Sequence, residues 1–156
     1  KRRLLILKNL AAIFCRLSEK GLVYSDLSPS NIFISKDIGS SEVWLIDADN
    51  IHYNNENNVC IGTMNYRAPE VASGHPNSIA GDEYSFALLA FEFLAFNKAF
   101  DGKSLIETDP ADSWGETSKD PCLLAEEGEY PWVADAKDES NCQLSGIRPF
   151  KDRFCP

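Results

Sequence analysis

The sequence has 156 residues, of which 44% are hydrophobic and 25% are charged. This length and composition are typical of one soluble globular domain and exclude a disordered tail, a collagen-like repeat and a membrane bundle. Residues 101–140 hold 12 acidic and 3 basic residues, so their balance, 3 − 12 = −9, equals the net charge of the whole chain. We expect this stretch to be a solvated face, with a docking site for basic partners as the alternative. The acidity argues against nucleic acid as a partner, because lysine and arginine must face the phosphates.

Cysteine spacing and apolar runs indicate neither a zinc centre nor a membrane segment. The five cysteines form no C-x-x-C pair and the two histidines lack a cysteine at finger-like spacing, so we expect reduced thiols in a cytoplasmic protein. The apolar run at 86–96 includes a glutamate and is too short to span a bilayer, so no membrane partner is expected. Because the chain starts with Lys1 rather than methionine and stops at Pro156 directly after a cysteine, we expect a piece of a longer protein.

The first half of the chain predicts one helix followed by short strands. Apolar residues at spacings of three and four predict an amphipathic helix that ends before Gly21, which is expected to adopt the left-handed conformation of a helix terminus. The helical positions are Leu4, Leu7, Leu10, Ala11, Phe14 and Leu17. Residues 22–24 form a short extended piece, and the apolar segments 32–34 and 43–46 predict a hairpin because a turn-rich stretch separates them.

The second half of the chain predicts a loop, two helices and an irregular end. The asparagine-rich residues 49–61 predict a loop, and Pro69 begins a short helix. Residues 82–96 are apolar nearly all round, so they predict a helix in the centre of the core. Beyond Lys98 the chain becomes irregular, with one short helix expected at 121–127.

Three polar side chains are candidates for chemistry. Asp26 follows the extended residues 22–24, Asn31 comes five residues later, and Asp47 leaves the end of the strand 43–46. We expect these spacings to place the three side chains at the same end of one small sheet. Carboxylate and amide oxygens are hard ligands that suit Mg²⁺, which leaves room for phosphate oxygens, and a further carboxylate can act as a base.

The segment from Asp26 to Asn31 resembles the catalytic loop of protein kinases, H-R-D-L-x-x-x-N. Asp47 stands where that family has D-F-G, and residues 62–70, GTMNYRAPE, are similar to the family's G-T-x-x-Y-x-A-P-E segment. Asp82 heads a buried helix, as an aspartate of the family does. Because four motifs occur in family order, the chain is identified as a member of the protein kinase superfamily, most similar in wording to a bacterial kinase-like group.

The resemblance implies a mainly α fold with short β strands, which corresponds to the C-terminal lobe of a protein-kinase-like fold. It is clear from residue 1 to about residue 132, whereas residues 133–156 are irregular. The sequence contains no G-x-G-x-x-G loop and no V-A-I-K-like strand, so we expect the N-terminal lobe, which covers the nucleotide, to be missing. We therefore expect residues 1–156 to form one lobe that is truncated at both ends.

The resemblance also implies ATP and Mg²⁺ as cofactors and gives a role to each matching residue. Asp26 would accept the proton of the acceptor hydroxyl, and Asn31 and Asp47 would hold Mg²⁺ and, through it, ATP. Ser28 and Thr63 would position the substrate. The alternatives are a turn or N-cap carboxylate for Asp26, a turn-closing amide for Asn31 and a hydrogen bond within the loop for Thr63.

Two further residues are expected to be structural. By resemblance, Glu70 pairs with an arginine, and Asp82 anchors the backbone of the catalytic loop from its helix. The sequence also departs from the family, since Tyr24-Ser25 replaces His-Arg. No arginine is then present before Asp26 to pair with a phosphorylated activation loop, so switching by loop phosphorylation is not expected.

The expected function of the parent protein is ATP-dependent phosphoryl transfer to serine or threonine of a protein substrate. The isolated chain is expected to be inactive because half of the nucleotide cleft is not encoded in it. A first alternative is a pseudokinase or kinase-like scaffold that binds partners without catalysis, and a second is a small-molecule kinase. Retention of Asp26, Asn31 and Asp47 together favours chemistry over a scaffold.

Overall fold

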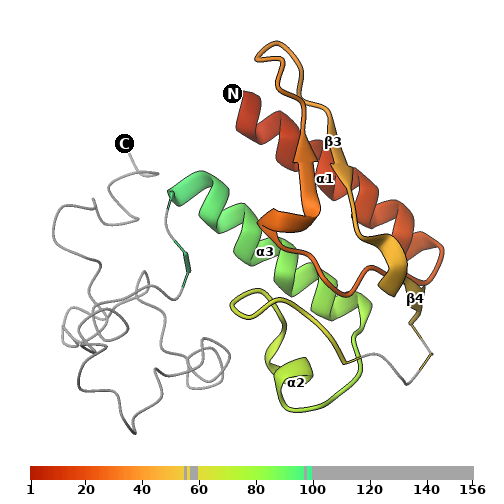
Figure 1. Cartoon of the computed structure of the whole chain (residues 1–156). Helices are drawn as coiled ribbons and strands as arrows, with labels where there is room; N and C mark the ends of the chain where they lie inside the picture. The colour runs from red at the N-terminus through yellow and green to blue at the C-terminus, as the bar shows by residue number, and fades with distance from the viewer. Residues whose placement is uncertain (55, 57–59, 97, 100–156) are drawn as a thin grey trace, which may run out of the picture.

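The computed structural model describes residues 1–54, 56, 60–96 and 98–99 (Figure 1). Its helices and strands are α1 (Arg2–Glu19), β1 (Leu22–Val23), β2 (Ile32–Ile34), β3 (Val43–Leu45), β4 (His52–Tyr53), α2 (Pro69–Ala72) and α3 (Ile79–Ala95), with two 3-10 helices, η1 (Pro29–Asn31) and η2 (Ala48–Asn50). The described part of the chain is therefore mainly helical with short strands, as predicted. The expected helix at 121–127, the acidic stretch 101–140 and the irregular end 133–156 lie outside the described residues.

Helix α1 confirms the helix predicted from the spacing of apolar residues. Its buried side chains Ile6, Leu7 and Leu10 lie on one face. The helix ends at Glu19, and Gly21 adopts a φ of 69°, while its N–H donates to the carbonyl of Ser18 at 2.8 Å. The predicted left-handed glycine at this terminus is confirmed, and it turns the chain into β1.

The strands form two separate antiparallel pairs. The predicted hairpin is confirmed, since β2 pairs with β3 and places Phe33 opposite Trp44. The loop predicted for residues 49–61 is wrong at His52–Tyr53, because these residues form β4 and pair with β1. The expectation of one small sheet that carries all three candidate residues is consequently wrong: Asp26 follows β1 of one sheet, whereas Asn31 and Asp47 flank β2 and β3 of the other.

Helix α3 begins three residues earlier than the sequence predicts. Its N-cap is Ser78, whose hydroxyl accepts the N–H of Gly81 at 3.1 Å, a side-chain cap that satisfies one of the free N–H groups of the first turn. The short helix predicted at Pro69 is confirmed as α2. Within the described residues, none of the helices is long and apolar enough to cross a membrane.

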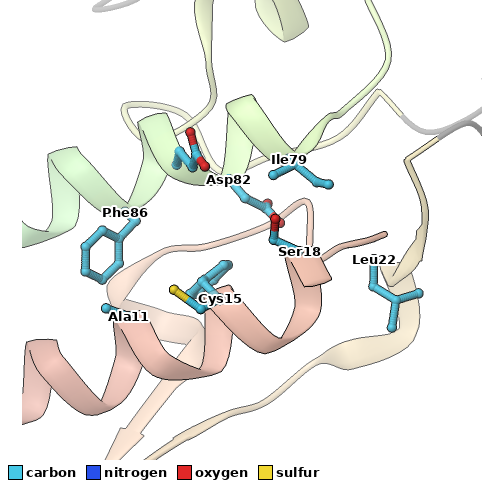
Figure 2. Close-up of a pocket in the computed structure, with 9 residues that line it drawn as sticks. Ala11, Cys15, Ser18, Leu22, Ile79, Asp82 and Phe86 are labelled. Carbon is cyan, nitrogen blue, oxygen red and sulfur yellow. The ribbon is translucent and has the colours of Figure 1, made fainter. Parts of the chain in front are cut away.

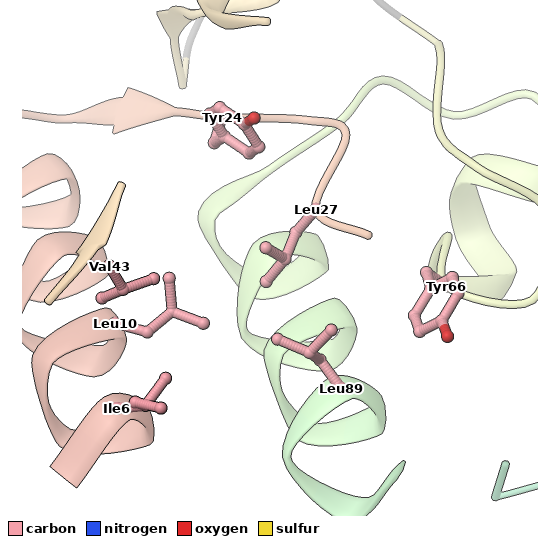
Figure 3. Close-up of a cluster of buried hydrophobic side chains, with 7 residues drawn as sticks. All are labelled: Ile6, Leu10, Tyr24, Leu27, Val43, Tyr66 and Leu89. Atoms are coloured by element: carbon pink, nitrogen blue, oxygen red, sulfur yellow. The ribbon is translucent and has the colours of Figure 1, made fainter. Parts of the chain in front are cut away.

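The hydrophobic core joins α1, α3 and the segment that carries Asp26. Figure 3 shows Leu10 of α1 and Leu89 of α3 pointing toward each other, and both side chains are 1% exposed. Tyr24 and Leu27, on either side of Asp26, are 0% and 1% exposed and belong to the same cluster. Burial of these two side chains fixes the loop on the core and presents the intervening Asp26 at its surface.

Candidate active site

Asp26 is held by two segments that are distant in the sequence. Its Oδ1 accepts the backbone N–H of Thr63 at 2.8 Å and the Thr63 hydroxyl at 2.7 Å. Its Oδ2 accepts an amide hydrogen of Asn31 at 3.0 Å. Both oxygens of this partly buried carboxylate are therefore oriented by hydrogen-bond donors.

Asn31 uses its amide nitrogen to fix the loop from Asp26 to Asn31, the segment that resembles the kinase catalytic loop. Nδ2 donates to the Asp26 carboxylate and also to the Asp26 backbone carbonyl, the latter at 2.9 Å. The loop closes on itself across five residues through these two bonds, which corresponds to the turn-closing alternative for Asn31. The same geometry directs the amide oxygen, the atom that a cation needs, away from Asp26.

Asp47 lies beside Asn31 because of the register of the β2–β3 hairpin. Ile46, directly before Asp47, donates its N–H to the Asn31 carbonyl at 3.0 Å and accepts the hydroxyl of Tyr24 on its own carbonyl. Asp47 itself is exposed and has a left-handed backbone, with φ 56° and ψ 57°. A residue other than glycine pays a conformational cost there, and such strain is concentrated at functional sites.

The buried phenol of Tyr24 has a raised pKa. Burial and, after it, the negative charges of Asp26, Asp47 and Asp82 together raise the pKa of the Tyr24 phenol to about 12. All three acids are therefore close enough to act on one group.

Asp82 fixes the backbone that precedes Asp26. Its Oδ2 accepts the N–H of Tyr24 at 2.6 Å and its Oδ1 accepts the N–H of Ser25 at 2.9 Å. The side chain is 5% exposed, and this burial raises its pKa, while the two backbone hydrogen bonds act in the opposite direction. The Asp82 carboxylate thus joins the first turn of α3 to the backbone directly before Asp26.

Two other expected site residues, Ser28 and Glu70, differ in their exposure to solvent. Ser28 is 0% exposed, and its hydroxyl lies 2.8 Å from the hydroxyl of Ser30, so its position does not support the expected contact with a substrate. Glu70 is exposed in the first turn of α2. Its expected pairing with an arginine stays a prediction.

A comparison of the chain with protein-family models agrees with its motifs, its loop geometry and its fold. The family model described as "Protein kinase domain" matches residues 4–133. This chain belongs to the protein kinase family. The match includes the loop from Asp26 to Asn31, Asp47 and the segment 62–70, so the kinase resemblance of these motifs is confirmed at the level of the family.

Curated relatives of this kinase chain come from animals and from a bacterium. Protein kinase C, eye isozyme, of Drosophila melanogaster is 37% identical over 90 residues, which cover 55% of this chain and 12% of the relative. Serine/threonine-protein kinase pkn2 of Myxococcus xanthus is 32% identical over 109 residues, covering 65% and 13%. Ribosomal protein S6 kinase alpha-2 of Homo sapiens is 35% identical over 109 residues, covering 65% and 14%. The aligned part is thus a small fraction of each relative's length.

The donor set of the kinase chain fits Mg²⁺, which protein kinases generally use together with ATP. Asn31, directly before β2, and Asp47, shortly after β3, offer an amide oxygen and an exposed carboxylate at the same end of the hairpin. Across the residues that the structure describes, no three histidine, cysteine, aspartate or glutamate side chains are grouped to hold a metal. Two protein ligands suffice for Mg²⁺ only when phosphate oxygens and waters complete its shell, so this set fits a nucleotide-bound ion rather than a permanent metal centre.

A cavity of about 230 Å³ lies elsewhere on the kinase chain, between α1 and α3 (Figure 2). Its apolar lining includes Ala11, Phe14 and Phe86, and Asp82 lies at its wall. Asp26, Asn31 and Asp47 do not line it. The cavity is therefore separate from the candidate active site.

Sequence reasoning missed two buried polar residues that contact the catalytic loop. His52 of β4 is 7% exposed, and its Nδ1 lies 3.2 Å from the Ser25 hydroxyl. Asn77, directly before the cap of α3, is 6% exposed and donates to the Ser25 carbonyl at 3.2 Å. No motif marks either residue. The only sequence signal is a polar side chain next to apolar segments, which does not identify its partner.

Proposed function

We propose that this chain supplies the catalytic loop, the Mg²⁺ ligands and the activation segment of an ATP-dependent protein kinase that phosphorylates serine or threonine. The observation that carries the proposal is the carboxylate of Asp26, which Asn31 and Thr63 orient from two sides. A carboxylate with both oxygens fixed in this way can accept the proton of a hydroxyl group without reorganising. The relative from Myxococcus xanthus, whose printed name is serine/threonine-protein kinase, supports the choice of acceptor.

Each residue of the candidate site would have its own role. Asp26 would orient the acceptor hydroxyl and take its proton, and the Thr63 hydroxyl would keep Oδ1 of that carboxylate in place. Asn31 and Asp47 would hold Mg²⁺, which with ATP supplies the phosphoryl group and neutralises its charge. Asp82 would keep the backbone before Asp26 fixed through its two hydrogen bonds. Positioning of this kind is the main contribution that a kinase makes to phosphoryl transfer.

We also propose that the described residues belong to the C-terminal lobe and that a second lobe, which covers the nucleotide, is needed for activity. The chain spans only 12–14% of the length of the relatives above. The isolated chain should accordingly show no saturable binding of Mg-ATP in the micromolar range, equivalent to roughly −8 kcal/mol. Calorimetry on the isolated chain tests this point.

The function itself is tested in the full-length protein with Mg-ATP and a library of peptides that contain serine, threonine or tyrosine. Transfer to serine or threonine is expected, and Asp26→Asn should lower kcat on the order of 10² to 10⁴-fold with nearly unchanged nucleotide affinity. Full transfer by Asp26→Asn would remove the catalytic role. Transfer to small molecules alone would favour a small-molecule kinase, and binding of partners without any transfer would favour the scaffold.

A further inference from the structure

Ser25, the residue directly before Asp26, has a left-handed backbone conformation, and each of its polar groups has a hydrogen-bond partner. Its φ is 78°, a left-handed value that side-chain-bearing residues rarely adopt, and it is 4% exposed. Its N–H donates to Asp82, its carbonyl accepts from Asn77, and its hydroxyl contacts Nδ1 of His52. Three side chains from two segments, β4 and the start of α3, thus occupy all three polar groups of one strained residue.

The hydrogen on the His52 ring can be assigned from its partners. Nδ1 lies 2.9 Å from the Asn50 carbonyl, and a carbonyl can only accept, so Nδ1 carries the hydrogen. The Ser25 hydroxyl oxygen, at 3.2 Å from the same nitrogen, then accepts part of the same hydrogen bond. His52 therefore links the start of β4 to the catalytic loop through one N–H group.

The other ring nitrogen of His52 shows that this link has a cost. Nε2 is buried, and the described residues include no hydrogen-bond partner for it. A buried polar atom without a partner is unfavourable, and an apolar side chain of similar size would avoid that loss. The Nδ1–H group, by contrast, faces the Asn50 carbonyl and the Ser25 hydroxyl, and this is the interaction through which the imidazole can hold Ser25.

Asn77 extends the same anchor to the partner of Asp26. Its Oδ1 accepts the N–H of Ile61 at 2.9 Å, and its Nδ2 donates to the Ile61 carbonyl at 2.8 Å and to the Ser25 carbonyl at 3.2 Å. Ile61 lies two residues before Thr63, which bonds to Asp26. One buried amide therefore joins the residue before Asp26 to the segment that carries Thr63.

We propose that His52 and Asn77 are positioning residues, which hold Ser25 in its left-handed conformation and thereby fix the Asp26 carboxylate against Thr63. The proposal rests on the proposed function for its effect on catalysis. Its structural part, the Asp26–Thr63 contact, does not depend on that function. Neither residue touches the reacting atoms: His52 acts through Ser25, and Asn77 acts through Ser25 and Ile61.

The experiment compares two substitutions of His52 in the full-length protein. His52→Leu removes the Nδ1–H group and the unpaired Nε2 together, so stability should be unchanged or higher while kcat falls about 10-fold and the KM for ATP stays within about twofold. His52→Asn is the matched control because its amide can place an N–H near the position of Nδ1, and it should keep kcat within about threefold of the unmodified protein. A merely structural role would not lower kcat while leaving stability intact.

A second variant and a second readout keep the test decisive. Ser25→Ala removes the same contact from the other side by deleting one oxygen atom, so it applies even where leucine at position 52 prevents folding. Amide hydrogen exchange at Thr63, whose N–H donates to Asp26, should be faster in His52→Leu and in Ser25→Ala but not in His52→Asn. In the double variant of His52→Leu and Ser25→Ala, kcat should equal that of either single variant, because both remove one interaction.

The outcomes separate failure of this inference from failure of the proposed function. Unchanged kcat and unchanged exchange at Thr63 in a folded His52→Leu or Ser25→Ala protein would overturn the positioning role while the kinase activity stands. If the unmodified full-length protein transfers no phosphoryl group, the proposed function fails, and exchange at Thr63 still decides whether His52 holds the Asp26–Thr63 contact.

Discussion

Asp26 and Thr63 lie 37 positions apart in the chain, yet one carboxylate oxygen of Asp26 accepts both the backbone N–H and the hydroxyl of Thr63. The catalytic loop and the segment 62–70 are therefore connected at the atom that we propose as the base. Gly62 allows this approach, because a Cβ at position 62 would lie 2.8 Å from the Cβ of Arg67 and 3.6 Å from the Ser25 carbonyl oxygen. The segment 62–70 thus supplies hydrogen-bond donors to the loop that carries Asp26.

This contact leads to a prediction for Thr63→Val in the full-length protein. Valine keeps the size of the side chain but removes the hydroxyl donor, so Oδ1 of Asp26 retains only the backbone N–H. Loss of one hydrogen bond to a charged group is worth roughly 1.5–3 kcal/mol, and we expect kcat to fall about 10-fold or more. Steady-state kinetics with a phosphorylated-peptide readout measure the change. Thr63→Ser is the control, since it keeps the hydroxyl; equal rates for the two variants would show that the hydroxyl is not needed.

A different signature is expected for Asp47→Asn. The amide keeps one oxygen but loses the charge that would hold Mg²⁺, so half-maximal transfer should require about 10-fold more Mg²⁺ or more. Measuring the transfer rate against the concentration of Mg²⁺ shows this shift. Glu42→Gln removes one exposed charge just before β3, whereas Asp47 lies near the opposite end of the strand. Its Mg²⁺ dependence should be unchanged, and an equal shift in both variants would indicate a general effect of net charge.

The sequence predicted the local parts of the fold because local spacing determines them. The apolar spacing of α1, the glycine after it and the turn between β2 and β3 depend on neighbours in the chain. Strand β4 was missed because it has two residues and forms only by pairing with Leu22 and Val23, about thirty positions earlier. A segment rich in asparagine carries no alternation that would indicate such a pairing.

The candidate site was likewise predicted only where local sequence motifs mark its residues. Asp26, Asn31 and Asp47 were found from motif spacing, and the hairpin register explains why Asn31 and Asp47 are neighbours. His52 and Asn77 were not found, because their role follows from what they touch: both bond to Ser25, which lies in another segment. Neither partner could be known before the tertiary structure, and neither residue belongs to a motif.

Tyr24 provides a prediction for alkaline pH. Its pKa in the folded protein is about 12, above the value of 10.0 for a free phenol. The folded protein keeps this proton over a range in which the unfolded chain releases it, so the contribution of Tyr24 to the free energy of unfolding is complete below pH 10 and is lost as the pH rises toward about 12. Urea denaturation of the unmodified protein and of Tyr24→Phe should therefore show a stability difference that changes over this range.

Absorbance of the tyrosinate ion gives an independent check of the same group. Tyr24→Phe should remove a component that titrates near pH 12, and the remaining tyrosines should be unaffected. At neutral pH the variant also loses the hydrogen bond from the Tyr24 hydroxyl to the Ile46 carbonyl, at a cost of about 1 kcal/mol. An ordinary pKa near 10 for this component would mean that the phenol is neither buried nor affected by the charges of Asp26, Asp47 and Asp82.

The core makes a prediction that does not depend on any enzymatic activity. Leu10 and Leu4 lie on the same helix, α1, but Leu10 is 1% exposed and Leu4 is 60% exposed. Leu10→Ala would leave a cavity against Leu89 and Val43, so the free energy of unfolding should fall by about 2–5 kcal/mol. Leu4→Ala keeps the same change of residue and of helix propensity without a cavity, and it should stay within about 0.5 kcal/mol. Chemical denaturation of both variants measures the difference. Similar losses of stability in the two variants would contradict the burial of Leu10 between α1 and α3.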